Sequence, residues 1–112
     1  MREITYLQAI NEALRESLRE DPRVFLMGED IGRHGGAFGV TRGLWEEFGG
    51  ERVRDTPISE NTLAGAALGA ALTGMRPVLE IMFLDFSLLA LDQIINEWAK
   101  VRYMYGGQCR AP

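Results

Sequence analysis

The chain has 112 residues, which is enough for one domain of ordinary size with its own hydrophobic core. Hydrophobic residues make up 46% of the sequence and charged residues 25%, and these values exclude a disordered chain. The formal net charge is -4 and no basic cluster occurs, which argues against nucleic acid as the main partner.

The first half of the chain alternates helical and extended patterns. Thr5 and Gln8 have the spacing of a capping box, at the start of a helix whose apolar residues recur every three or four positions. This helix should end before Pro22, because the residue that precedes a proline disfavours helical geometry. The next predicted elements are a buried strand, a short helical turn and a second strand, over residues 24–27, 44–48 and 52–55.

The second half begins with a clearer helix and strand. Ser59 or Asn61 is expected to cap a helix that continues to about Thr73, with Gly74 as its C-terminal stop. The apolar residues 77–83 predict a third strand.

A long helix is predicted over residues 85–103. At helical spacing it would direct inward Leu88, Leu91, Ile94, Ile95, Trp98 and Val101. Strands that alternate with helices predict an α/β domain with a largely parallel sheet flanked by helices. Three strands are few for an open parallel sheet, so we expect the chain to be the N-terminal part of a longer natural protein.

Three features are weak candidates for chemistry. The glycine-rich loop 32–43 follows a strand, as phosphate-binding loops do, but it lacks the GxGxxG spacing and the P-loop lysine. A flexible surface loop is the favoured interpretation. His34 lies between loop residues and is expected to be solvated, not catalytic. Cys109 is the single cysteine, without a basic partner in the sequence, and we predict no metal site.

Glu60 is the stronger candidate, because it falls where a strand gives way to a helix. Open α/β sheets bind ligands at this edge, and the first turn of a helix favours a carboxylate. From position alone, a helix-capping acid is the favoured interpretation of Glu60. Gly65 and Gly69 lie inside the same helix, where each costs about 1 kcal/mol relative to alanine. They predict a helix face that another backbone approaches closely.

Glu60, four residues and then Gly65-Ala66-x-x-Gly69-Ala70 match a motif of thiamine-diphosphate enzymes. The whole chain resembles one family, the beta subunit of the decarboxylating component of 2-oxo acid dehydrogenase complexes. The similar stretches are residues 28–32, 41–44, 52–60, 76–78, 92–96 and 104–108. The resemblance implies that residues 1–112 form the N-terminal part of a transketolase-like pyrimidine-binding domain.

The resemblance also implies roles for individual residues. Glu60 would hydrogen-bond the pyrimidine ring of thiamine diphosphate and favour the tautomer that activates the cofactor. The positions that match the lining of the pyrimidine pocket are Ile58, Met82 and Phe86. Glu29 and Asp92 resemble acids that form a proton path between two active sites in some relatives. Some relatives also have an acid at the position of Leu89, so the path would be interrupted at this residue here.

The implied enzyme is a heterotetramer in which an alpha subunit holds the diphosphate and magnesium. It would decarboxylate a 2-oxo acid and pass the acyl group to a lipoyl group of an acyltransferase component. Two alternatives are an acetoin-cleaving dehydrogenase, which the segment 80–86 resembles, and a non-catalytic α/β assembly domain. Because residues 1–8 lack a signal-peptide pattern and no long apolar run occurs, we expect a soluble, cytoplasmic protein without membrane contact.

Overall fold

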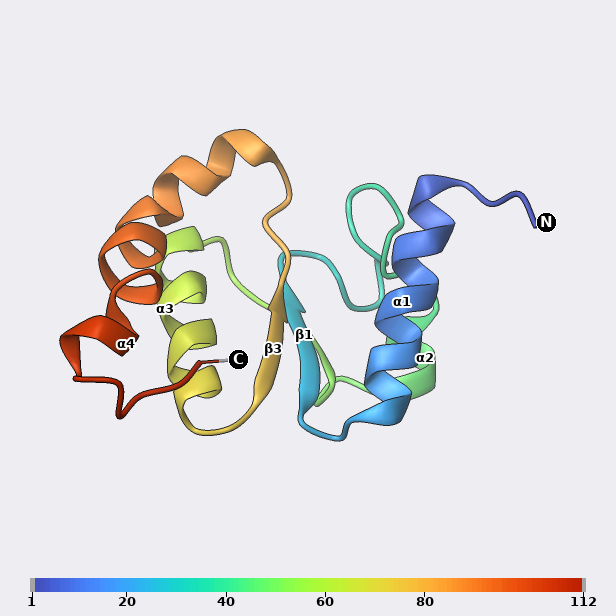
Figure 1. Ribbon diagram of the computed structural model, residues 1–112. Helices are drawn as coiled ribbons and strands as arrows, with labels where there is room; N and C mark the ends of the chain where they lie inside the picture. Colours follow the sequence, from blue (N-terminus) through green and yellow to red (C-terminus); the bar gives the residue numbers. More distant parts are fainter. Residues whose placement is uncertain (1, 112) are drawn as a thin grey trace.

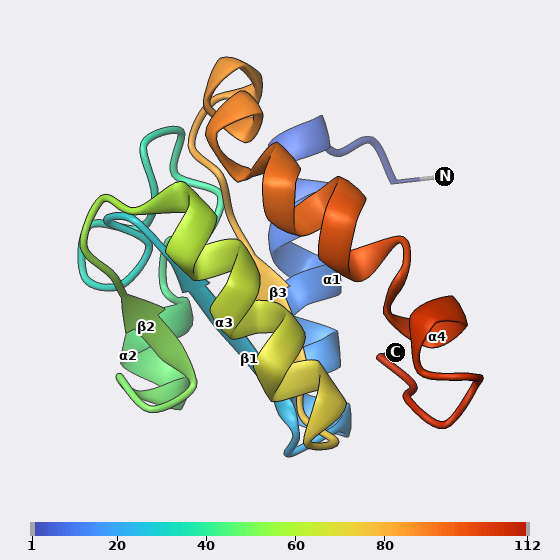
Figure 2. The ribbon, with the colours of Figure 1, turned by 90° about the vertical axis from the view of Figure 1, so that its left-hand side faces the viewer.

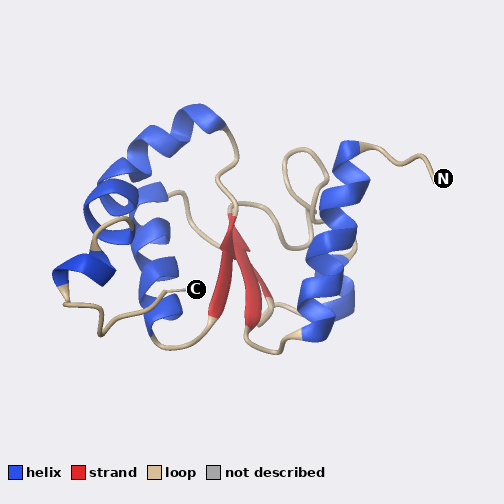
Figure 3. Cartoon of the chain, in the orientation of Figure 1, coloured by secondary structure: helices blue, strands red, loops and turns tan. Residues whose placement is uncertain are grey.

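The computed structural model describes residues 2–111 of the chain. A parallel sheet lies between two layers of helices (Figures 1 and 3), which confirms the predicted fold class. In spatial order the strands are β2 (Val53–Asp55), β1 (Val24–Gly28) and β3 (Arg76–Leu79). One layer contains α1 (Tyr6–Glu20) and α2 (Leu44–Phe48), and the other contains α3 (Glu60–Leu72), the 3₁₀ helix η1 (Leu84–Ala90), the π-helix η2 (Asp92–Trp98) and α4 (Val101–Met104).

The central strand β1 is buried along its whole length. Leu26 pairs with Val53 on one side and with Val78 on the other. Alternate side chains of β1 enter two separate clusters. The cluster beneath α1 and α2 contains Leu18, Val24, Leu26, Ile31, Leu44 and Val53, and the cluster beneath α3 contains Phe25, Met27, Leu63 and Ala67. Because helices cover both faces of β1, its sequence is apolar throughout and does not alternate.

The first helix begins and ends as predicted. The Gln8 N–H donates to Thr5 Oγ1 at 3.2 Å, and the Thr5 N–H donates to Gln8 Oε1 at 2.9 Å, which completes the capping box. The helix ends at Glu20, and Asp21 before the proline has extended geometry.

The third strand is shorter than the predicted range 77–83. It covers Arg76–Leu79, and one further hydrogen bond follows, from the Glu80 N–H to the Met27 carbonyl at 2.9 Å. β1 ends at Gly28, so the residues after Glu80 have no neighbouring strand on that side and leave the sheet.

The predicted single helix over 85–103 is wrong in its geometry. The structure has three short helical segments instead, η1, η2 and α4, and η1 and η2 run beside α3 (Figure 2). The 3₁₀ helix and the π-helix differ from the α-helix in the number of residues per turn, so apolar residues at α-helical spacing do not stay on one face. Val101 is buried, whereas Leu88 is 68% exposed and Ile95 is 51% exposed. Within residues 2–111, no helix combines the length and apolar character that a membrane crossing requires.

Candidate functional site

The three parallel strands end at the same edge of the sheet, and the site is built there (Figure 1). Backbone hydrogen bonds fix the first residues beyond the strands. The Thr56 N–H donates to the Gly28 carbonyl at 3.0 Å, and the Glu80 N–H donates to the Met27 carbonyl at 2.9 Å. A glutamate follows each strand within a few residues, and the three are Glu29 after β1, Glu60 after β2 and Glu80 after β3.

Glu60 is the first residue of α3 and is only 8% exposed. Ser59 occupies the N-cap position, as one of the two predicted residues, and its hydroxyl makes no capping hydrogen bond. Ser59 contributes its carbonyl instead, which accepts from the Leu63 N–H at 2.9 Å. The positive end of the α3 dipole and the buried carboxylate of Glu60 therefore lie together, and Gly74 with φ of 93° follows the helix at its far end as predicted.

Glu29 lies close enough to Glu60 for the two carboxylates to interact. The pKa of Glu29 is raised mainly by burial, and then by the negative charges of Glu60 and Asp30. A hydrogen bond from the backbone of Ser59 acts in the opposite direction. The structure thus brings together two acids that are separated along the chain.

Asp92 occupies a different environment from Glu29. It is the exposed first residue of η2, and its carboxylate accepts from Asn96 Nδ2 at 2.8 Å. Its charge is not among those that raise the pKa of Glu29. Leu89, which stands where some relatives have an acid, is 60% exposed on η1.

Apolar side chains near the head of α3 remain uncovered by the rest of the chain. Ile58, two residues before Glu60, is 80% exposed, and Phe86 on η1 is 39% exposed. Met82 is half-buried in the segment between β3 and η1. η1, which carries Phe86, packs against α3, the helix that begins at Glu60 (Figure 2). An uncovered apolar side chain close in sequence to a buried acid, with a helix that carries another packed against the same element, fits a ligand with an apolar ring and a polar atom.

Comparison with known proteins identifies the family. The profile of the family described as "Transketolase, pyrimidine binding domain" matches residues 2–112. The chain belongs to this family. The domain is 50% identical over 109 residues to the 2-oxoisovalerate dehydrogenase subunit beta of Bacillus subtilis, covering 97% of this chain and 33% of that protein.

Two further relatives have the same kind of name. The domain is 47% identical over 110 residues to the mitochondrial pyruvate dehydrogenase E1 component subunit beta of Bos taurus, covering 98% of this chain and 31% of the relative. It is 48% identical over 112 residues to the corresponding subunit of Rhizobium meliloti, covering all of this chain and 24% of the relative. These matches confirm the resemblance inferred from the sequence, and the domain spans about a third or less of each relative.

The two helix glycines of the pyrimidine-binding domain have different surroundings. A Cβ atom added at Gly65 would lie 2.9 Å from Gln93 Oε1, so a side chain of η2 occupies the space that the glycine leaves. A Cβ atom at Gly69 would meet no atom of the described chain within 4 Å. No backbone of residues 2–111 provides the close approach that the glycines predict, and Gly69 lies open on α3.

The glycine-rich loop of the domain is held by hydrogen bonds at both ends. The Gly32 N–H donates to Asp55 Oδ1 at 2.6 Å, and Thr41 Oγ1 donates to the Ile31 carbonyl at 2.7 Å. Asn11 Nδ2, from α1, donates to the Val40 carbonyl at 2.6 Å. These contacts fasten the loop to the sheet edge and to α1, whereas the sequence favoured a flexible surface loop.

Within residues 2–111, no group of three or more His, Cys, Asp or Glu side chains could hold a metal ion.

Glu80 is the site residue that sequence reasoning missed. It is half-buried, and burial raises the pKa of its carboxyl group. Its Oε1 lies 3.5 Å from the position of a Cβ atom on Gly36, so the carboxylate faces the glycine-rich loop. The sequence signal for Glu80 was that it is the single acid within the apolar run 77–83. The whole run, with Glu80, was predicted to be a strand, so no site role was assigned to it.

Glu80 gives a pH-dependent prediction. Folding raises the pKa of this acid, so the folded chain holds the proton more tightly and stability falls as pH rises from the ordinary carboxyl range. Glu80→Gln cannot ionise. The variant should therefore be more stable than the wild type at neutral pH, and the difference should disappear below about pH 4. Urea denaturation across this range measures it, with the exposed Glu16→Gln as a control for the lost charge; a constant difference at all pH values would contradict the prediction.

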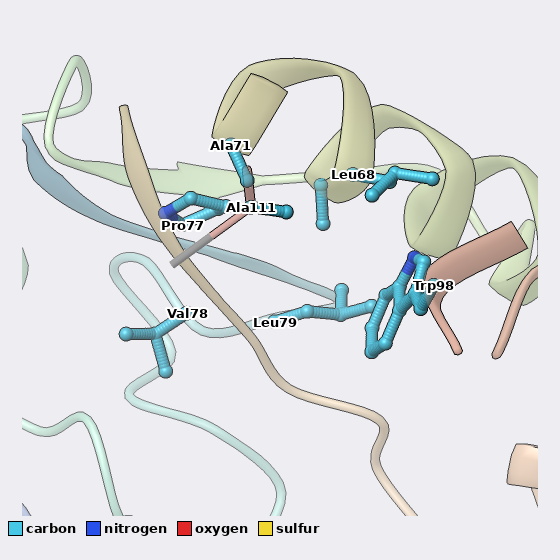
Figure 4. A pocket seen from close by; sticks show the side chains of 8 residues that line it. Leu68, Ala71, Pro77, Val78, Leu79, Trp98 and Ala111 are labelled. Carbon is cyan, nitrogen blue, oxygen red and sulfur yellow. The ribbon is translucent and has the colours of Figure 1, made fainter. Parts of the chain in front are cut away.

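One cavity of the domain has no acid among its lining residues. It has a volume of about 400 Å³ between α3, β3 and the C-terminal segment, and Leu68, Leu79, Trp98 and Ala111 are among its lining residues (Figure 4). All of its lining side chains are apolar or aromatic, and the indole N–H of Trp98 donates to the Ala64 carbonyl at 3.0 Å. Without an acid or base, the cavity has no group for proton transfer, so we place the candidate site at Glu60.

Proposed function

We propose that this pyrimidine-binding domain is part of the beta subunit of a thiamine-diphosphate-dependent 2-oxo acid dehydrogenase. In this proposal it holds the aminopyrimidine ring of the cofactor. The observation that carries the proposal is Glu60, a residue that is only 8% exposed and begins α3, with the exposed side chain of Ile58 two positions before it. The names of the relatives, beta subunits of 2-oxoisovalerate and pyruvate dehydrogenases, support the same class of reaction.

The residues at this end of the domain fit the aminopyrimidine ring. Ile58, Met82 and Phe86 would hold its apolar faces and edges, since two of them are left substantially exposed by the chain itself. Glu60 would hold a ring nitrogen. A hydrogen bond to a buried carboxyl group is stronger than one in water, because no solvent competes for it.

When bound, thiamine diphosphate supplies the electron sink for loss of carbon dioxide from a 2-oxo acid. The task of Glu60 is to share a proton with the ring nitrogen and so to set the tautomer of the ring. Burial of the carboxylate excludes water from this hydrogen bond. We assign Glu29, whose pKa is raised, to the exchange of that proton. A role for Asp92 in the same path requires an intervening group, because Asp92 interacts with Asn96 and not with Glu29.

The partners follow from this division of the cofactor. We assign the diphosphate and its magnesium ion to an alpha subunit, and we propose a heterotetramer in which α3 meets another subunit at Gly69, the helix glycine that the described chain leaves open. Gly65 lies on the same helix, where the Gln93 side chain fills its space. The acyl group would pass to a lipoyl group of an acyltransferase component.

We keep the cytoplasm as the proposed location of the protein. The names of the relatives include both bacterial and mitochondrial proteins, so cell fractionation is the test.

Of the two alternatives, neither is favoured by an observation in the structure. The segment 80–86 resembles acetoin-cleaving enzymes, but the three relatives compared above are named for 2-oxo acids. A non-catalytic assembly domain would have no use for a buried carboxylate at the head of α3.

Cofactor binding tests the proposal. The beta subunit alone should bind thiamine diphosphate weakly or not at all, because most of the affinity comes from the diphosphate site on the partner. Together with the alpha subunit it should bind the cofactor and release carbon dioxide from pyruvate or 2-oxoisovalerate. Calorimetry and carbon dioxide release measure the two results, with acetoin as the competing substrate. Tight, magnesium-dependent binding by the beta subunit alone would contradict the assigned division.

A further inference from the structure

Three phenylalanine rings form a continuous edge-to-face chain beside the candidate site. The centroids of Phe38 and Phe83 lie 5.4 Å apart with their planes at 77°, and those of Phe83 and Phe86 lie 5.4 Å apart at 75°. Both pairs have the geometry that aromatic quadrupoles favour. The chain of rings therefore connects the glycine-rich loop to Phe86, a residue of the proposed pyrimidine pocket.

Both ends of this aromatic chain are fixed by backbone contacts. Phe38 lies between Gly36 and Gly39, which have φ of 83° and 77°, and the Gly39 N–H donates to the Gly36 carbonyl at 3.0 Å. This left-handed geometry suits glycine and turns the chain tightly around Phe38. At the other end, the Phe86 N–H donates to the Phe83 carbonyl at 3.0 Å, so these two residues keep a fixed relative position.

The exposure of the rings separates this arrangement from ordinary core packing. Phe38 is 59% exposed, Phe83 is 43% exposed and Phe86 is 39% exposed. Side chains that remain this open contribute less to the stability of the fold than the buried core. The hydrophobic clusters beneath the helices contain none of the three.

We propose that Phe38 and Phe83 are positioning residues for Phe86, and that the glycine-rich loop thereby fixes the orientation of the aminopyrimidine ring. Phe38 acts through Phe83 and does not itself touch the cofactor. The inference rests on the proposed function, since it assigns Phe86 to the pyrimidine pocket. It gives the glycine-rich loop a task, because the glycines of the loop place an aromatic side chain against Phe83.

The test measures binding of two ligands to the assembled enzyme by calorimetry. Thiamine diphosphate contains the aminopyrimidine ring, whereas magnesium pyrophosphate contains only the group assigned to the alpha subunit. Phe38→Leu should weaken binding of thiamine diphosphate by roughly 2- to 10-fold, the range expected from loss of one edge-to-face pair, and should leave pyrophosphate binding unchanged. Phe38→Tyr keeps the ring and should bind like the wild type. Tyr6→Leu, an 84% exposed aromatic on α1, is the control for loss of a surface ring.

A double variant tests whether Phe38 acts through Phe86. In a Phe86→Leu background, the additional change Phe38→Leu should have no further effect on thiamine diphosphate binding. Equal losses for both ligands, wild-type affinity in Phe38→Leu, or a full effect in the Phe86→Leu background would each overturn the inference while the proposed function stands. Failure of the wild-type assembly to bind thiamine diphosphate would instead overturn the proposed function, and the inference with it.

Discussion

Replacing Glu60 with glutamine should lower the turnover of the assembled enzyme by roughly 100- to 10,000-fold. Glutamine keeps the size and hydrogen-bonding capacity of the side chain but cannot share a proton with the ring nitrogen. Affinity for the cofactor should fall less, because the diphosphate is assigned to the partner. The fold should tolerate the change, since Glu60 and Glu29 are like charges close to one another. Steady-state turnover and melting temperature are measured on the same reconstituted variant.

A helix-capping role for Glu60 gives the opposite pair of results. Loss of a favourable charge at a helix N-terminus costs up to about 1 kcal/mol of stability and leaves chemistry unaffected. Near-normal turnover with a lowered melting temperature would therefore refute the catalytic assignment. Glu46 is the matched control, because it is an exposed acid in the first turn of α2. Glu46→Gln should leave turnover at the wild-type level.

Replacing Gly69 with leucine should break the subunit assembly while the domain itself becomes slightly more stable. The position is exposed on α3 and has no described atom within 4 Å of an added Cβ, so leucine meets no obstacle within the chain. Leucine is also the better helix former, by roughly 0.5–1 kcal/mol. A neighbouring subunit packed on this face would be displaced by the added side chain. Light scattering measures the assembly and urea denaturation of the dissociated subunit measures its stability.

Ala13→Leu provides the control for Gly69→Leu. Ala13 is exposed on α1, which lies on the opposite side of the sheet (Figure 1). This variant adds a leucine to an exposed helix face without touching α3, so it should assemble normally. An intact assembly in Gly69→Leu would mean that Gly69 faces solvent or a wide cleft, and the α3 face would lose its proposed partner.

Most of the fold could be predicted because its signals are local. The capping box at Thr5, the apolar run of β1 and the helix stop at Gly74 each depend on a few adjacent residues. The segment 84–104 could not be predicted correctly, because its apolar spacing indicates an α-helix while the chain adopts 3₁₀ and π turns. The length of β3 could not be predicted from its own residues either, because it depends on where the partner strand β1 ends, at Gly28.

The candidate site was predictable in part. Glu60 could be found from its place between a strand and a helix, and its burial agrees with the importance given to it. The proximity of Glu29 follows from the parallel pairing of β1 and β2, which no local pattern contains. The same holds for the contact between Phe38 and Phe83, since it joins a loop to a segment beyond β3. Long-range pairing, not residue type, was the missing information.

The central place of β1 has a consequence for the order of folding. β2 and β3 each pair with β1 and not with each other, and both are separated from it by long connections. Closing such connections lowers the entropy of the chain before the strand pairing can stabilise it. Val24–Gly28 therefore has to serve as the template on which the sheet assembles, whichever neighbour arrives first. Folding should be slow relative to helical bundles of this size, and conservative changes in β1 should slow it more than changes in β2 or β3.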